Sequence, residues 1–348
     1  MSNDPIAWLE AGIERGWHRG AQLYVSVAGR VVWDVAVGCA RADMLFCWLS
    51  ATKPVGAVAL GQLHERGRLD WDDPVARYLP AFAQHGKDRI TIRHLLTHTS
   101  GIPNLELDPM RFTWEEILTQ VCAVVPNAPP GMVAAYNYST TWYLVAALVE
   151  RLDGRNYGQY VREEIFARAG MTDSWIGMPA EQYRAYGPRM GVLWNTWRTP
   201  PVPQPWDNEA SASVCQPGRG GYGPARELGR FYEALLSDRL LRPATQAVLT
   251  QRHRVGMFDE TFRHVMDWGL GFVVNSGRYG AETVPYGFGR YASEETFGHG
   301  GAQSSMAFCD PVRQLVVAWI CDGMCGEPRH HERNRELNTA IYEALGMT

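Results

Sequence analysis

The run Leu49–Pro54 places a serine and a lysine three residues apart, at Ser50 and Lys53, directly before a proline. Proline lacks an amide N–H and is best tolerated in the first turn of a helix, so the run predicts a helix that begins here, with Ser50 at its N-terminus. Residues three apart on a helical turn share a face, which brings the two side chains together. The free N–H groups and the positive dipole end of such a turn favour an anion beside the Ser50 hydroxyl.

Lysine usage strengthens the interpretation of this pair. The chain has 33 lysine and arginine residues, of which only Lys53 and Lys87 are lysines. Arginine cannot release its proton at working pH, whereas a desolvated lysine can. A serine hydroxyl is a weak nucleophile until a neighbouring base takes its proton. The pattern therefore favours Ser50 as a nucleophile and Lys53 as its base.

Composition excludes several other classes of protein. Of the 348 residues, 46% are apolar and 20% are charged, as in ordinary globular proteins. A net charge of -4 gives no basic surface for nucleic acid, and no apolar run reaches the length of a membrane span. The first 17 residues lack the basic and apolar regions of a secretory signal. Seven cysteines without C-x-x-C spacing are typical of reduced thiols, so we expect a cytoplasmic location.

Hydrophobic periodicity predicts an α/β fold with strands near both ends of the chain. The expected strands are 21–27, 31–37, 269–275, 305–309 and 314–321. The expected helices are 5–16, 51–66, 113–123, 140–152, 156–169, 224–236 and 333–345. Residues 179–224 are rich in Pro, Gly and Trp and are predicted as long loops. We therefore expect an α/β domain of residues 1–60 and 225–348, a mainly helical insertion of residues 61–224, and an active site at their junction.

Two other motifs do not predict cofactor sites. His94 and His98 have the i,i+4 spacing of metal ligands on a helix, but no H-E-x-x-H pattern or third ligand accompanies them. We expect hydrogen-bonded structural histidines there. The G-x-G-x-x-G run 218–223 does not follow a strand, so it lacks the context of a dinucleotide site. The sequence implies neither a metal nor an organic cofactor.

Several ordered motifs together resemble the serine β-lactamase-like superfamily, which includes class C β-lactamases, D-amino-acid peptidases, family VIII carboxylesterases and related transacylases. The S-x-x-K signature at 50–53 is followed by IRHLLTHTSGI at 92–102, AGMTDS at 169–174, WGLGF at 268–272 and FGHGG at 297–301. The resemblance runs from the 21–37 hairpin to the last helix. It implies a β-lactamase-like fold, in which an antiparallel sheet is flanked by terminal helices and carries a large helical insertion.

The resemblance also assigns roles to residues. Ser50 falls on the nucleophile and Lys53 on its base, while the catalytic tyrosine is either Tyr136 or Tyr138. Counting back from Glu150 and Gly154 favours Tyr138, and counting forward from Gly131 favours Tyr136; we prefer Tyr138. A phenol beside Lys53 could have its pKa lowered by that cation and pass a proton to the leaving group.

The third motif of the superfamily, a K-T-G strand, aligns with His299, Gly300 and Gly301. The backbone N–H of Ala302 is then expected to pair with that of Ser50 as an oxyanion hole. Histidine replaces the lysine that would meet a β-lactam carboxylate, and no Ser-Asp-Asn motif is present. We therefore expect poor cleavage of penicillins and cephalosporins.

The expected function is that of a carboxylesterase-like serine hydrolase or acyltransferase that forms an acyl-Ser50 intermediate from a small ester or thioester. One alternative is a transacylase that passes the acyl group to an amine or alcohol in natural-product biosynthesis. A second is an inactive β-lactamase-like binding module, which the intact S-x-x-K, tyrosine and H-G-G motifs argue against.

Overall fold

A computed structural model describes residues 4–348 of the chain. The predicted lack of a secretory signal depends in part on residues 1–3, which lie outside the described residues. Among the helices of residues 4–348, none is both long enough and apolar enough to cross a membrane.

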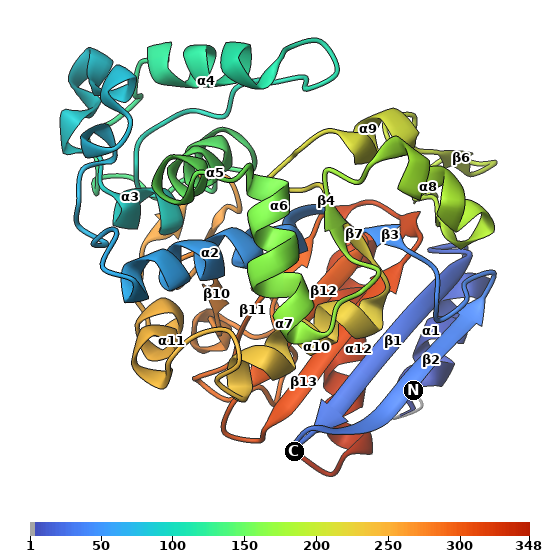
Figure 1. The fold of residues 1–348 in the computed structure, drawn as a ribbon. Helices are drawn as coiled ribbons and strands as arrows, with labels where there is room; N and C mark the ends of the chain where they lie inside the picture. The colour runs from blue at the N-terminus through green and yellow to red at the C-terminus, as the bar shows by residue number, and fades with distance from the viewer. Residues whose placement is uncertain (1–3) are drawn as a thin grey trace.

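A six-stranded antiparallel sheet forms the centre of the α/β part of the fold (Figure 1). In spatial order its strands are β10 (Val273–Val274), β11 (Phe297–Gly301), β12 (Ser305–Asp310), β13 (Leu315–Cys321), β1 (Gly20–Val27) and β2 (Arg30–Gly38). The predicted hairpin of β1 and β2 is confirmed, and the C-terminal strands pair with it through β13. All six strands come from outside residues 61–224, although the exact boundaries of the two predicted domains stay a prediction.

Side chains along each strand alternate between the two faces of this sheet, so both faces can bury apolar residues. Helices cover both faces. Leu23 and Val25 of β1 belong to the core shared with α1 (Pro5–Glu14) and α12 (Glu327–Ala344). Tyr24 points to the other face, where its hydroxyl donates to Glu233 of α10 (Ala225–Leu236) at 2.7 Å. The terminal helices therefore flank the sheet as the resemblance implied.

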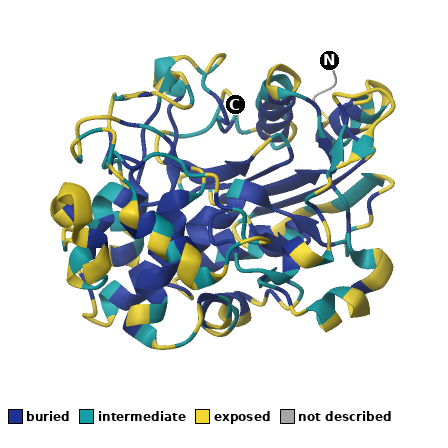
Figure 2. Ribbon diagram, turned by 90° about the horizontal axis from the view of Figure 1, so that it is seen from above, coloured by how far each residue is buried: buried dark blue, intermediate teal, exposed yellow. Residues whose placement is uncertain are grey.

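The helical part packs around α2 (Lys53–Glu65), which is buried over eleven consecutive residues. Small residues allow this: a Cβ on Gly56 would lie 3.1 Å from both Tyr157 and Val145. Figure 2 shows the buried positions concentrated on the strands and the central helices, with exposed positions on the outer helices and loops. The other helices are α3 (Ile92–Leu96), α4 (Trp114–Ala123), α5 (Thr140–Asp153), α6 (Tyr157–Val161), α7 (Ala167–Ala169), α8 (Ala180–Tyr186), α9 (Glu209–Ser213) and α11 (Pro243–Thr250).

Short strands tie the remaining loops together. One three-stranded sheet contains β3 (Phe46–Cys47), β7 (Gly221–Gly223) and β4 (Trp175–Ile176). A second contains β14 (Gly323–Met324), β5 (Trp194–Asn195) and β6 (Val202–Pro203), and a two-stranded sheet contains β8 (Phe258–Asp259) and β9 (His264–Val265). These pairings join segments far apart in the sequence.

The predicted extents of three segments were wrong. Residues 179–224 contain two short helices and three short strands and are not a continuous loop. Helix α12 begins at Glu327, six residues before the prediction, because its polar first turns carry no apolar periodicity. The strand expected at 269–275 shortens to β10, since Gly271 has a left-handed φ of 82° that breaks the extended run.

Candidate active site

Ser50 lies in a tight turn at the start of the central helix, as predicted. The 3₁₀ turn η1 (Leu49–Thr52) runs directly into α2, whose first turn contains Pro54. The preceding residue, Leu49, has a φ of 51°, a conformation that costs a non-glycine residue about 1 kcal/mol or more. Surrounding contacts must therefore hold this turn in place.

Two neighbouring strands supply those contacts. The Trp48 N–H donates to the Gly221 carbonyl of β7 at 2.7 Å, and the Ser305 hydroxyl of β12 donates to the Trp48 carbonyl at 2.7 Å. Gly301 of β11 allows the closest approach, because a Cβ there would lie 2.2 Å from the Trp48 carbonyl oxygen. The Gly-rich 218–223 run thus supports the Ser50 turn.

Lys53 is fully buried, with Nζ within hydrogen-bond distance of three oxygens. Nζ lies 3.0 Å from Ser50 Oγ, 2.9 Å from the Tyr138 carbonyl and 2.8 Å from the Gly218 carbonyl. Burial, and secondly the positive charge of Arg219, hold the pKa of Lys53 well below its usual range. The structure therefore brings Ser50 and Lys53 together as the spacing predicted.

The preference for Tyr138 over Tyr136 does not agree with the geometry. Tyr136 is buried and hydrogen-bonds to Ser50, and Lys53 Nζ lies 5.2 Å from the centre of its ring. The side chain of Tyr138 is 46% exposed, and this residue reaches Lys53 through its backbone carbonyl. Burial raises the pKa of the Tyr136 phenol, and this effect outweighs the lowering by the hydrogen bond with Ser50. The phenol at the site is thus protonated, contrary to the expected lowering of its pKa.

Long-range contacts fix the position of Tyr136. The His98 ring packs against its ring at a centroid distance of 4.8 Å, tilted by 54°, and accepts a hydrogen bond from the Asn137 N–H at 3.0 Å. Asp259 accepts from the Tyr136 N–H at 3.2 Å and forms a buried ion pair with Arg254 at 3.0 Å. The sequence predicted a structural role for His98, whereas no local pattern around Asp259 indicated one.

The other predicted structural histidine is also hydrogen-bonded. His94 Nδ1 accepts from the Thr91 N–H at 3.1 Å, within the N-terminal cap of α3. Among residues 4–348, no group of three or more His, Cys, Asp or Glu side chains is arranged to hold a metal ion.

His299 and Gly300 lie on β11, and both line the cavity that contains Ser50. Burial, and secondly the charge of Lys53, lower the pKa of His299 to about 3, so the ring is neutral at pH 7. Its Nδ1 lies 2.7 Å from the Gly300 carbonyl, which can only accept, so the hydrogen of the neutral ring is on Nδ1. Ala302 follows directly after this strand and also lines the cavity.

Ser50 opens into a mostly apolar cavity of about 330 Å³. Its walls include Tyr136, Tyr138, His299, Gly300, Ala302, Phe262, Val273 and Tyr286. A second cavity of about 730 Å³ shares Tyr138 with the first and contains Ser139, Gly218 and Arg219. Tyr138 therefore lines both spaces, of which only the first is also lined by Ser50.

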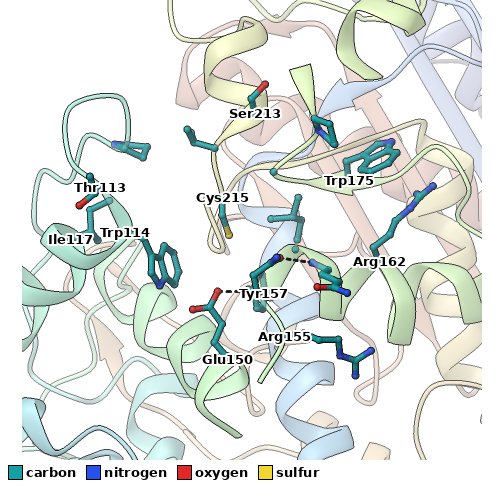
Figure 3. Close-up of a pocket in the computed structure, with 18 of the residues that line it drawn as sticks. Thr113, Trp114, Ile117, Glu150, Arg155, Tyr157, Arg162, Trp175, Ser213 and Cys215 are labelled. Atoms are coloured by element: carbon teal, nitrogen blue, oxygen red, sulfur yellow. Dashed lines mark hydrogen bonds between the residues drawn. The ribbon is translucent and has the colours of Figure 1, made fainter. Parts of the chain in front are cut away.

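A third cavity, of about 840 Å³, is lined by other residues (Figure 3). Trp114 and Cys215 line it, together with Glu150, whose carboxylate accepts from the Tyr157 N–H at 2.9 Å. Glu150 thus caps the start of α6, which is a structural role. Ser50 and Lys53 are not among the residues of this cavity.

Comparisons with known proteins agree with the fold and with the family that the motifs resemble. The family described as "Beta-lactamase" matches residues 6–340. The chain is 29% identical to the esterase EstB of Burkholderia gladioli over 73% of this chain and 74% of that protein. It is 29% identical to PbpX, a putative penicillin-binding protein of Bacillus subtilis, and spans 56% of its length.

The fold comparison covers almost the whole chain. The crystal structure of a penicillin-binding protein homologue from Caulobacter crescentus superposes with a TM-score of 0.79 at 27% identity, over 99% of this chain and 98% of that one. A family VIII carboxylesterase gives a TM-score of 0.81 at 24% identity over 97% of this chain and 96% of that one. The chain therefore belongs to the beta-lactamase family, within the serine β-lactamase-like superfamily that its motifs resemble.

Proposed function

We propose that this protein is a serine hydrolase or acyltransferase that forms an acyl-Ser50 ester from a small ester or thioester. The observation that carries the proposal is the environment of Lys53. Its Nζ is buried, has two backbone carbonyls as partners, and lies 3.0 Å from Ser50 Oγ.

The two carbonyls would orient the lone pair of a neutral lysine. A carbonyl can only accept, so the two N–H groups of the neutral amine donate to Tyr138 and Gly218. The lone pair is then left facing Ser50 Oγ, where it accepts the hydroxyl proton as the hydroxyl attacks the acyl carbon. Desolvation of Nζ supplies the neutral form that this step requires.

Tyr136 is the group that we assign to the leaving-group proton. Its phenol hydrogen-bonds to Ser50 and keeps its own proton, because burial raises its pKa. It can donate that proton to the departing oxygen or sulfur and regain one from Lys53. The backbone N–H groups of Ser50 and Ala302, which line one cavity, are proposed to stabilise the oxyanion.

Acyl transfer to an amine or alcohol is the second candidate function. The cavity of about 730 Å³ shares Tyr138 with the cavity that contains Ser50, and we propose it as the space from which an acceptor approaches the acyl-enzyme. A transferase needs its acceptor held in attacking geometry, where effective molarities reach roughly 10⁵–10⁸ M. Tyr143, Trp206 and Arg219 line this second space and could bind such an acceptor.

Intact-mass analysis with a chromogenic short-chain ester tests both functions. An acyl adduct on Ser50 supports the proposed function, and its lifetime in water is compared with its lifetime in a panel of amines and alcohols. Saturable selectivity for one acceptor with suppressed hydrolysis would identify a transacylase, whereas dominant hydrolysis with every acceptor would identify an esterase. Absence of any adduct or turnover would favour the inactive binding module.

Tyr136→Phe should lower kcat by about 10²–10⁴-fold, because it removes the hydroxyl that we assign to proton transfer. Tyr138→Phe is the matched control, since it removes an identical hydroxyl two residues away while keeping the carbonyl that meets Lys53. Both variants are measured on one ester. A larger loss in Tyr138→Phe would return the catalytic role to Tyr138.

A further inference from the structure

A carboxylate lies in the wall of the cavity that contains Ser50. Glu327, the first residue of α12, lines that cavity together with Ser50, His299 and Ala302. Its side chain is 49% exposed, so it stands at the rim of the cavity in contact with solvent. None of the roles proposed above uses this residue.

Hydrogen bonds hold this carboxylate in a fixed place beside the loop that carries the Ala302 N–H, one of the two proposed oxyanion donors. The Tyr286 hydroxyl donates to its two oxygens at 3.3 and 3.2 Å, and Gln303 Nε2 donates at 3.1 Å. Gln303 directly follows Ala302, and its own Oε1 accepts from the Gly326 N–H at 2.7 Å. Gln303, in the loop that carries the Ala302 N–H, therefore binds both the Glu327 carboxylate and the backbone of the preceding residue.

The same contacts favour its charged form. Burial by itself would raise the pKa of Glu327, but bonds from His331, Gln303 and Tyr286 lower it below the usual value. His331 lies one turn along α12, with Nε2 at 3.3 Å from the carboxylate. A neutral His331 leaves the negative charge uncompensated, whereas a protonated one would offset it.

Neither arginine nor lysine is among the described residues that line this cavity. Its two histidines are His299, which is neutral at pH 7, and His331, which lies beside Glu327. The cavity thus has one fixed carboxylate within mostly apolar walls. In a cleft with low-dielectric walls and charge of one sign, the electric field that acts on a bound substrate is strengthened.

We propose that this cavity selects substrates with an ammonium or other cationic group and discriminates against substrates with a carboxylate, with Glu327 as the residue that sets the preference. This inference rests on the proposed acyl-Ser50 chemistry. A cavity that disfavours carboxylates is also consistent with the expected poor cleavage of penicillins and cephalosporins, because each of these carries a carboxylate.

The test uses three p-nitrophenyl esters with acyl chains of matched length that end in an ammonium, a methyl or a carboxylate group. We expect kcat/KM to fall in that order. The ratio of the cationic to the anionic ester should fall by roughly three- to thirtyfold in Glu327→Gln, and 1 M salt should reduce it in the unaltered protein. A second ester series, with the charge on the alcohol portion, covers the other orientation.

Two variants serve as controls. Glu332→Gln removes an exposed carboxylate from the same helix, where it pairs with Arg15 at 3.4 Å outside the cavity, and should leave the ratio unchanged. His331→Gln removes the only titratable partner of Glu327 in α12 and should keep or increase the cationic preference. Because the readout is a ratio of substrates, a general loss of activity in one variant does not affect it.

The inference is overturned if both ester series form acyl-Ser50 with no charge preference, or if the preference is equal in Glu327→Gln and insensitive to salt. Either result would leave the proposed function intact. If none of the esters acylates Ser50, the proposed function itself fails.

Discussion

Ser50→Ala is expected to abolish acyl-enzyme formation and to lower ester turnover by roughly 10⁴–10⁶-fold. The hydroxyl is the only nucleophile that the site places beside the Lys53 base, at 3.0 Å from Nζ. The remaining groups, including the backbone N–H donors, can still bind the ester but cannot form the covalent bond. The measurements are steady-state kcat/KM and intact mass after incubation with the ester.

The control for this variant is a measurement of whether it is still folded. Alanine removes one partly exposed oxygen, so circular dichroism and the thermal midpoint should remain close to those of the parent protein. Near-native turnover by a purified alanine variant, with contaminating esterase excluded, would show that the whole assignment is wrong.

Lys53→Arg is expected to be nearly as inactive as Lys53→Ala, with a loss of about 10²–10⁴-fold in kcat/KM. Arginine keeps the positive charge but cannot release its proton, so it cannot accept the one on Ser50. The buried site, closed by the Tyr138 and Gly218 carbonyls, also has little space for a guanidinium. Lys87→Arg is a specificity control, because the other lysine donates to the Val124 carbonyl outside the site.

The pH profile of the unaltered protein gives an independent check on Lys53. Only the neutral amine can act as the base, so kcat/KM should fall as the pH decreases through the lysine pKa. Burial lowers that pKa, which moves this loss of activity to lower pH than an exposed lysine would give. Retention of most activity in Lys53→Arg would show that charge alone matters at this position.

The sequence by itself determined the features that depend on local geometry. The i,i+3 spacing of Ser50 and Lys53 and the position of Pro54 specify a helical start that puts the two side chains on one face, although contacts from distant strands hold the turn before it. The hairpin β1–β2 followed from alternation with a period of two, and the ordered motifs indicated the family. These signals are carried by residues close together along the chain.

Only the tertiary structure distinguishes the surroundings of the two candidate tyrosines. Tyr136 and Tyr138 are two residues apart in the same loop, so local pattern cannot separate them. Tyr136 is held by a tilted ring contact with His98, from the 92–102 segment, and by a hydrogen bond from its backbone N–H to Asp259, 123 residues away. Such contacts leave no periodic trace in the sequence.

The charge of the cavity was also decided by tertiary structure. Glu327 lies 277 positions after Ser50 in sequence and enters the cavity because α12 begins there and Gln303 holds its carboxylate. His299 is neutral because the folded chain buries it beside Lys53. Local preferences specify turns, helices and strands, whereas desolvation and electrostatic interactions between distant residues exist only after those elements have packed.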